Sequence, residues 1–478
     1  MSLSEREIRS IMDRTAKQVG TGQSGSAPVR PIDAQRLGIF QDVDSAVNAA
    51  YAAFQQYERM ALSDRKRIVA AMRDKMRQHG RELAHEAAEE TGLGRAEDKV
   101  KKNELVTEKT PGPEILESVA WSGDDGLTLV ERAPFGVVAA ITPTTNPTST
   151  IINNAISILS AGNAVAFNVH PNAKQVSAKN IRLLNEAILS AGGPANLITA
   201  VAEPSIDSAQ ALMRHPRARL LLVTGGGGVV VEAMRSGKRA ITAGPGNPPV
   251  VVDESADIEQ AGRSIVFGAS FDNNVICTDE KELFVVEKVA AALKQAMQRA
   301  GAFFVERSHE QRRLMETIFK EYNTSPRGIS KMRNEWIGKN AGVILQAAGI
   351  DAPRDLRLAV VEVPLDHTLV WTEQMMPIFP FVRLPDVGTC IEMAIAAESG
   401  NGHSAAMYSC NIDHLSEMAR RINTSIFVKN GPTLAGLGYG GEGYTSFSIA
   451  SPTGEGLTTA LSFSRPRRCT MVDHFRIV

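Results

Sequence analysis

The chain has 478 residues, of which 43% are hydrophobic and 22% are charged, so it is long enough to bury more than one core. Its 52 basic and 53 acidic residues leave a formal net charge of -1, which excludes an overall field that attracts nucleic acid or an anionic membrane. The four cysteines include no close pair, which argues against a disulfide framework and for a reducing, cytoplasmic compartment. There is no apolar run of membrane-spanning length and no apolar core of a secretory signal, so we expect a protein that is neither inserted nor exported.

Residues 1–20 are predicted to form a short amphipathic helix. Ile8, Ile11, Met12 and Val19 fall at helical spacing among charged neighbours. Residues 21–36 follow as a flexible linker. An apolar stripe of this kind docks either on its own protein or on a partner, and the linker favours a partner.

Residues 43–109 are predicted to form several helices with polar outer faces. Two of them cover residues 45–60 and 63–79, for which Ser45 and Ser63 are suitable N-caps. We assign no chemical role to any residue of this region.

Between Phe135 and Thr242, short apolar runs alternate with helical segments. This alternation is typical of βαβ units around a parallel sheet. The predicted strands are 137–141, 164–167, 197–201 and 220–223, and the predicted helices are 148–160, 173–190, 205–214 and one that starts near Val229.

The loops after these strands are candidate cofactor loops, because ligands of such sheets bind at the carboxyl ends of the strands. Glycines 225–228 precede a helix, so their backbone N–H groups can face a pyrophosphate or a nicotinamide. The GxGxxG spacing at 436–441 precedes no apolar helix, and we interpret it as a chance match. The candidate residues are Thr142, Pro143, Thr144, Asn168, His170, Pro171, Thr224, Gly225 and Gly226.

A second α/β region follows Pro249 and contains Cys277. In this polar loop a thiolate with a lowered pKa would be a nucleophile toward carbonyl carbon, and the alternative is a small buried apolar residue. A cysteine that faces the glycine loops of another domain favours the catalytic interpretation. The predicted strands are 250–252, 283–286, 405–409 and 425–428, and the predicted helices are 258–269, 289–300, 386–398 and 414–422.

Several ordered segments carry a resemblance to a known family. They are 141–148, 151–154, 243–249, 270–273 with Cys277, 373–377 and 425–432. From about Gly38 to the C-terminus the sequence resembles the CoA-acylating aldehyde dehydrogenases. Within that family it is most similar to the propionaldehyde dehydrogenases of propanediol-using bacterial microcompartments, with the acetaldehyde dehydrogenases of the ethanolamine pathway as close relatives.

The resemblance implies the aldehyde dehydrogenase fold, an α/β architecture of two doubly wound parallel-sheet domains plus a small β oligomerisation arm. It implies an NAD- and CoA-binding domain over residues 37–242, a catalytic domain over 243–442, and a return of residues 443–478 to the cofactor domain. The arm would contain a hairpin at about 123–133 and the C-terminal stretch from Leu461 to Val478, with an exposed strand such as Cys469 to Ile477. Because an exposed strand edge pairs readily with another, we expect a homo-oligomer, either a dimer or a tetramer.

The resemblance also implies roles for single residues. Cys277 adds to the aldehyde carbon as a thiolate, and the Asn146 amide with the Cys277 backbone N–H stabilises the oxyanion. NAD, placed by the candidate loops, accepts a hydride and leaves a thioester on Cys277. Glu373 matches the glutamate that binds the nicotinamide ribose hydroxyls, and the alternative is a solvated loop carboxylate.

The fate of the thioester follows from an absent carboxylate. Hydrolytic members of the superfamily have a glutamate where this chain has Ala243, which cannot act as a base. Without a base, water attack slows by about two to four orders of magnitude, whereas thiols ionise near neutral pH. Transfer to CoA is therefore expected, and hydrolysis to the free acid is the alternative. Asn274-Val275 replaces a Gly-Gln pair of the hydrolytic enzymes. Asn168 replaces their ribose-binding lysine, so the preference between NAD and NADP stays open.

His403 is a candidate to take the CoA proton, with a structural role as the alternative. His403, Cys410 and His414 fit no familiar ligand spacing, so we expect no metal. The sequence thus predicts NAD-dependent oxidation of a short-chain aldehyde, propanal before acetaldehyde, to acyl-CoA inside a bacterial microcompartment. The N-terminal helix would dock on a shell or core protein. An assembly protein with a vestigial cleft is the other alternative, and intact Cys277, Asn146 and Glu373 argue against it.

Overall fold

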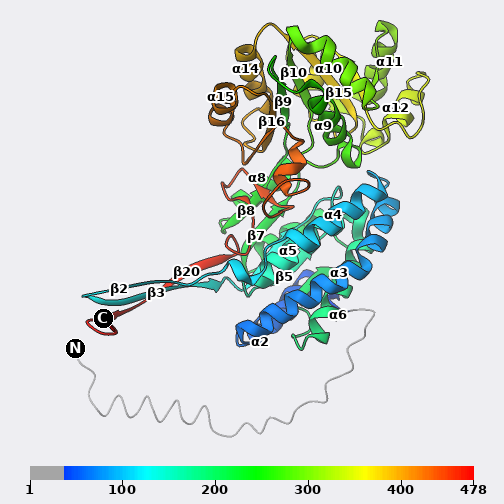
Figure 1. Ribbon diagram of the computed structural model, residues 1–478. Coiled ribbons are helices and arrows are strands. Elements are labelled where there is room, and N and C mark those ends of the chain that lie inside the picture. The colour runs from blue at the N-terminus through cyan, green and yellow to red at the C-terminus, as the bar shows by residue number, and fades with distance from the viewer. Residues whose placement is uncertain (1–36) are drawn as a thin grey trace, which may run out of the picture. The chain divides into compact units, whose positions relative to one another are not determined.

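Two parallel sheets and a three-stranded antiparallel sheet organise residues 37–478, the part of the chain that the computed structural model describes (Figure 1). The predicted N-terminal helix and its linker lie outside the described residues. Within residues 37–478, no helix combines the length and the apolar character that crossing a membrane requires.

Three helices, α2 (Val43–Tyr57), α3 (Leu62–Thr91) and α4 (Ala96–Lys109), precede the arm. The prediction that Ser45 and Ser63 are N-caps is wrong, because the N-cap residues are Asp42 for α2 and Ala61 for α3. The carboxylate of Asp42 caps α2, because it accepts the backbone N–H of Ser45 at 2.8 Å. Helix α3 starts before Ser63 and runs far beyond its predicted end, until Gly92 adopts a left-handed φ of 63°.

The first sheet is entirely parallel, with the strand order β1-β6-β5-β4-β7-β8. Three of its strands are buried at every residue, as expected for a sheet with helices on both faces. The strands are β1 (Ile39–Phe40), β4 (Val137–Ile141), β5 (Ala164–Asn168), β6 (Ile198–Val201), β7 (Ala218–Thr224) and β8 (Ala240–Ala243). The helices between them are α5 (Pro147–Ser160), α6 (Lys174–Ser190), α7 (Ile206–Arg214) and α8 (Gly227–Arg235).

The connections of this sheet create a switch point between β4 and β7. The chain runs outward from β4 through β5 to β6, then crosses to β7 on the other side of β4. The loops that leave the carboxyl ends of β4 and β7 therefore diverge and open a crevice, which is where such sheets bind ligands.

The second sheet is also parallel, with the order β11-β14-β15-β10-β9-β16-β17. The sequence assigned no strand between residues 287 and 404, where the structure has β11, β14 and β15. The strands are β9 (Pro249–Val252), β10 (Glu282–Val286), β11 (Phe303–Phe304), β14 (Ala359–Glu362), β15 (Ile378–Leu384), β16 (Ser404–Tyr408) and β17 (Ile426–Lys429). The main helices are α9 (Ile258–Ser270), α10 (Glu287–Arg299), α11 (Ser308–Ile318), α12 (Ala341–Ala347), α13 (Thr368–Trp371), α14 (Val387–Glu398) and α15 (Ile412–Ile422).

The antiparallel arm consists of β2 (Val119–Gly123), β3 (Gly126–Pro134) and β20 (Ser464–Val472). The C-terminal strand lies within the predicted stretch 461–478, but it covers Ser464–Val472 rather than Cys469 to Ile477. Strand β20 pairs with β3 from Ser464 opposite Pro134 to Val472 opposite Gly126, so it ends where its partner turns. Figure 1 shows the arm apart from the two parallel sheets.

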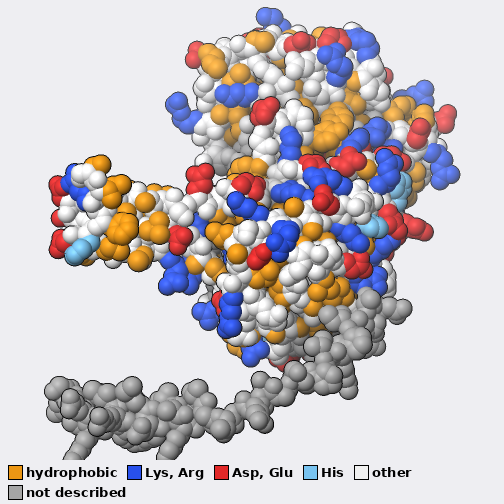
Figure 2. Space-filling model, turned by 60° about the horizontal axis from the view of Figure 1, so that its bottom comes forward, with side chains coloured by type: hydrophobic (Ala, Val, Ile, Leu, Met, Phe, Trp, Pro, Cys, Tyr) orange, Lys and Arg blue, Asp and Glu red, His pale blue; other side chains and the backbone are white. Residues whose placement is uncertain are grey.

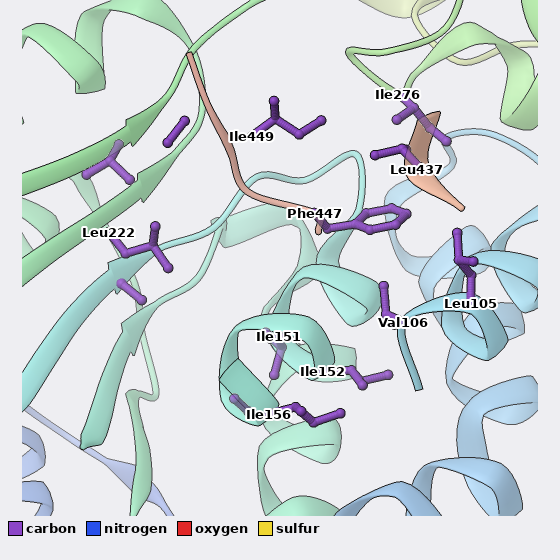
Figure 3. Packing of buried hydrophobic residues seen from close by; sticks show 14 of the residues in the cluster. Leu105, Val106, Ile151, Ile152, Ile156, Leu222, Ile276, Leu437, Phe447 and Ile449 are labelled. Atoms are coloured by element: carbon purple, nitrogen blue, oxygen red, sulfur yellow. The ribbon is translucent and has the colours of Figure 1, made fainter. Parts of the chain in front are cut away.

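One buried apolar cluster connects α4 and α5 with the first sheet and with the segment after β17 (Figure 3). The returning segment is also held by a hydrogen bond, because the Phe447 backbone N–H donates to the Asn153 side chain at 3.0 Å. Ile276, the neighbour of Cys277, belongs to the same cluster, so the loop before β10 is anchored in the core. Members of the cluster that Figure 3 labels are Leu105, Val106, Ile151, Ile152, Ile156, Leu222, Ile276, Leu437, Phe447 and Ile449.

Candidate active site

A cavity of about 810 Å³ opens between loops of the two parallel sheets, a size suited to a cofactor together with a small substrate. The proposed nucleophile Cys277, the amide Asn146 and the carboxylate Glu373 all contribute to its wall. His403 does not line it. The cofactor-loop residues predicted from the sequence all line it: Thr142, Pro143, Thr144, Asn168, His170, Pro171, Thr224, Gly225 and Gly226.

The glycine loop after β7 is suited to an anionic group. Helix α8 starts at Gly227 rather than at Val229, and its N-cap, Gly226, has no side chain to occupy the free backbone donors. A Cβ added at any of glycines 225–228 would meet nothing within 4 Å. These N–H groups can therefore approach a pyrophosphate without hindrance.

The loop after β4 offers further unused donors. The hydroxyl oxygens of Thr142 and Thr144 are buried without a hydrogen-bond partner. A buried polar atom without a partner costs about 1–3 kcal/mol, so a bound group that pairs with it is favoured. Together with the open start of α8, these hydroxyls fit a dinucleotide such as NAD.

Asn168 is held in place by the start of α7. Its side-chain oxygen accepts the Ser208 hydroxyl at 2.5 Å, and Ser205 caps the same helix. His170 is half-exposed, and burial lowers the pKa of its imidazole. Both residues thus present neutral polar groups at the cavity wall.

The loop before β10 holds Cys277 on a strained backbone. Asp272, Asn273 and Asn274 have φ values of 44°, 55° and 62°, a left-handed run that non-glycine residues rarely adopt. Buried hydrogen bonds offset the strain. The Asn273 amide donates to Gly338 O at 2.8 Å, and the Lys281 ammonium donates to Asn274 O at 2.8 Å. The loop position is therefore fixed by groups on several elements.

The sequence prediction that the Cys277 thiol has a lowered pKa is wrong for the free protein. Burial and then the charge of Glu373 raise its pKa to about 12, while the charge of Lys281 acts in the opposite direction. The side chain keeps part of its surface accessible through the cavity, so water lessens the cost of ionisation. The resting group at neutral pH is the thiol.

Glu373 is itself a perturbed group. Burial raises its pKa, and the Lys281 ammonium and the Gly246 backbone N–H oppose that change. The carboxyl side chains in the cavity wall are Glu232 and Glu373, and the wall at the end of β8 is Ala243. Position 243, where the resemblance places the base of the hydrolytic enzymes, therefore has no carboxylate.

His403 lies behind Gly246, outside the residues that line the cavity. A Cβ added at Gly246 would come 2.9 Å from His403 Cγ and 2.7 Å from Cys277 O, so the three residues pack closely. Burial lowers the pKa of the imidazole to about 4, which keeps it neutral at physiological pH. Its role toward CoA stays a prediction. In the part of the chain that the structure describes, no group of three or more His, Cys, Asp or Glu side chains could hold a metal ion.

Two buried lysines of α4 lie behind this wall, and neither was predicted from the sequence. The ammonium groups of Lys99 and Lys102 contact the Asp272 carboxylate, and Lys102 also donates to Asn146 Oδ1 at 2.6 Å. Burial lowers the pKa of Lys99 to about 8. A signal was present, because Lys99, Lys102 and Val106 follow one another at helical spacing, which places both charges on the apolar face of α4.

The fold and this cavity agree with what the comparisons show. The model of the aldehyde dehydrogenase family matches residues 31–458, and the chain belongs to this family. It is 46% identical to the acetylating acetaldehyde dehydrogenase EutE of Escherichia coli, over the full length of both chains.

Two solved structures are similar to this one. The propionaldehyde dehydrogenase of Rhodopseudomonas palustris, with bound CoA and an acylated cysteine, has a TM-score of 0.88 at 46% identity over 91% of this chain and 98% of that one. A propionaldehyde dehydrogenase from the fucose utilisation bacterial microcompartment of Clostridium phytofermentans has a TM-score of 0.88 at 43% identity, over 92% of this chain and 100% of that one. The α/β aldehyde dehydrogenase fold expected from the sequence is confirmed.

Proposed function

We propose that this chain is a CoA-acylating aldehyde dehydrogenase that oxidises a short-chain aldehyde, propanal before acetaldehyde, to its acyl-CoA with NAD. The observation that carries the proposal is the cavity wall, which combines Cys277 and Asn146 with an open glycine loop and has alanine at position 243. The names of the relatives and the acylated cysteine in one of the similar structures support it.

The chemistry starts from the Cys277 thiol. The thiol releases its proton to solvent as the sulfur bonds to the aldehyde carbon, and the raised pKa of Cys277 makes this release unfavourable in the free protein. The carbonyl oxygen becomes an alkoxide, which accepts hydrogen bonds from the Asn146 amide and the Cys277 backbone N–H. NAD, when bound, supplies the acceptor for the hydride that leaves this carbon. A thioester on Cys277 remains.

The second half of the reaction is acyl transfer. The CoA thiol gives up its proton as its sulfur bonds to the thioester carbon, the bond from that carbon to Cys277 breaks, and the departing Cys277 thiolate takes up a proton, so one thioester replaces another and the resting thiol is restored. Ala243 offers no base to activate a competing water molecule. The proposal therefore includes a product, acyl-CoA, that a free-acid-forming enzyme would not make.

We assign the cofactor contacts to the loops of the first sheet. Residues 142–144, 168–171 and 224–226 would hold NAD, with Glu373 on the nicotinamide ribose. We keep the proposed limits of the cofactor domain, 37–242, and of the catalytic domain, 243–442. The contact of Phe447 with Asn153 supports the proposed return of residues 443–478 to the first of these domains.

We also assign the arm to a homo-oligomer. Apolar side chains gather on its surface, as Figure 2 shows. Val119, Trp121, Met471 and Val472 are all exposed there, at 44–62% of their surface. Burial in a second subunit would remove this area from water. Encapsulation in a microcompartment, with the N-terminal helix as the docking element, is proposed from the resemblance and from the similar microcompartment enzyme.

The test is NADH formation by the purified protein with propanal and NAD, in the presence and absence of CoA, with the acyl product identified. The proposal expects CoA-dependent turnover to propanoyl-CoA. Equal turnover without CoA, with propanoic acid as the product, would favour the hydrolytic alternative, and no turnover with propanal or acetaldehyde would contradict the proposal altogether.

A further inference from the structure

A buried charge cluster lies behind the cavity wall, where α4 meets the strained turn before Cys277. Lys99 and Lys102 keep only 2% of their side-chain surface exposed, and Asp272 keeps none. Both ammonium groups contact Asp272 Oδ2, Lys99 at 3.0 Å. Two positive charges thus share one carboxylate, and each needs a further acceptor to offset its desolvation.

The further acceptors belong to the loop after β4. Lys99 donates to the backbone oxygen of Thr145 at 3.2 Å, and Lys102 donates to the side-chain oxygen of Asn146 at 2.6 Å. The two lysines therefore resemble each other in burial and in their bond to Asp272, but only Lys102 contacts the Asn146 amide.

This contact decides which way the amide points. An asparagine side chain has an NH₂ donor and an oxygen acceptor of nearly equal shape. A neighbour that can both donate and accept a hydrogen bond can pair with either of them. A lysine ammonium only donates, so the oxygen of Asn146 must face Lys102 and the NH₂ group must face away from it. The NH₂ group contacts the Thr145 hydroxyl at 3.2 Å, while Asn146 lines the cavity with Cys277.

We infer that Lys102, held by Asp272, is a positioning residue that fixes the Asn146 amide with its N–H toward the alkoxide formed on Cys277. The inference rests on the proposed function, because it gives the amide a reaction to serve. It also gives the turn before Cys277 a second task. The same run of residues that places the nucleophile supplies the carboxylate that holds the lysine behind the oxyanion donor. Asp272 is itself fixed from α4, since its backbone N–H donates to Asp98 at 3.1 Å.

The experiment compares Lys102→Met with Lys99→Met, a matched control that removes an equally buried charge from the same carboxylate and leaves the Asn146 contact in place. We expect kcat for propanal oxidation to fall about 10- to 100-fold in Lys102→Met, below the 10²- to 10³-fold loss typical of deleting an oxyanion donor, with KM for the aldehyde little changed. In Lys99→Met we expect a loss of less than about threefold. The rate of Cys277 alkylation by iodoacetamide should be similar in both variants, which shows that the nucleophile itself is intact.

A double-mutant cycle with Asn146→Ala separates positioning from a structural role. If Lys102 acts through the amide, Lys102→Met should change kcat by less than about twofold once Asn146 is alanine. A loss of the same size in both backgrounds would overturn the inference, as would equal losses in Lys99→Met and Lys102→Met. Should Lys102→Met not fold, Lys102→Gln provides the second variant. Its amide can pair with either end of Asn146, so a loss of kcat in this variant that is the same with and without the Asn146 side chain would again overturn the inference. Inactive wild-type protein would instead contradict the proposed function.

Discussion

The two parallel sheets have the same doubly wound architecture, but they turn opposite edges toward the cavity. The first sheet contributes loops at the carboxyl ends of β4, β5, β7 and β8. The second contributes segments at the amino ends of its strands, namely Cys277 before β10 and Glu373 before β15. The general rule that ligands bind at the carboxyl ends of strands therefore predicts only the part of the site that the first sheet contributes.

The two edges also differ in how firmly they are held. At the first edge, glycines 225–228 have open space beside them and two threonine hydroxyls have no partner. At the second edge, the backbone before Cys277 is strained and is tied down by buried hydrogen bonds. An open edge can accommodate a cofactor that comes and goes, whereas a nucleophile benefits from a fixed position.

The largest effect is expected at the second edge. Cys277→Ala should reduce CoA-dependent NADH formation by on the order of 10⁴-fold or more, because no other group can form the thioester. Removing one partly exposed sulfur should leave thermal unfolding almost unchanged. The control is Cys410→Ala, which removes an exposed thiol and should retain full activity. Substantial turnover by Cys277→Ala would show that Cys277 is not the nucleophile.

A smaller effect is expected at the first edge, where β8 ends in Ala243. Ala243→Glu places a carboxylate in the cavity wall, and Ala243→Gln has nearly the same shape without a base. We expect free propanoic acid without CoA to increase at least about tenfold in Ala243→Glu compared with Ala243→Gln, toward the 10²- to 10⁴-fold that general bases provide. Equal acid formation in both variants would mean that position 243 does not decide the fate of the thioester.

The smallest effect concerns Glu373, whose charge acts on the proposed nucleophile Cys277 at the same edge of the second sheet. Below a pKa of about 12, the thiolate fraction of Cys277 should rise about tenfold per pH unit, and so should the iodoacetamide alkylation rate of the free enzyme. The Glu373 charge raises this pKa, so Glu373→Gln should lower it and increase the rate about threefold at pH 8 to 9.

The difference should shrink at lower pH, where Glu373 becomes protonated in the wild type. Glu232→Gln is the control, because Glu232 lines the same cavity but is not among the main charges that shift the Cys277 pKa. A slower reaction in Glu373→Gln would contradict the electrostatic interpretation.

The sequence by itself determined the class of fold, the family and part of the cavity wall. The alternation of apolar runs with helical segments predicted the four inner strands of the first sheet, β4 to β7, since strands buried on both faces leave a distinct pattern. The two edge strands, β1 and β8, were not predicted. Cys277, Asn146, Glu373 and the three candidate loops were placed in the cavity wall because they lie in continuous motifs, and their roles stay predictions. The second sheet was predicted only in part, because β11 has two residues, β14 has four, and β15 contains Pro380, a residue that argues against a central strand.

Only the tertiary structure decided what surrounds these residues. The raised pKa of Cys277 depends on burial and on Glu373, which is far away in the sequence. The contact of Lys102 with Asn146 joins two segments 44 residues apart. The edge that each sheet turns toward the cavity follows from how the chain crosses between the sheets. Such properties depend on distances through space, and local sequence patterns fix only distances along the chain.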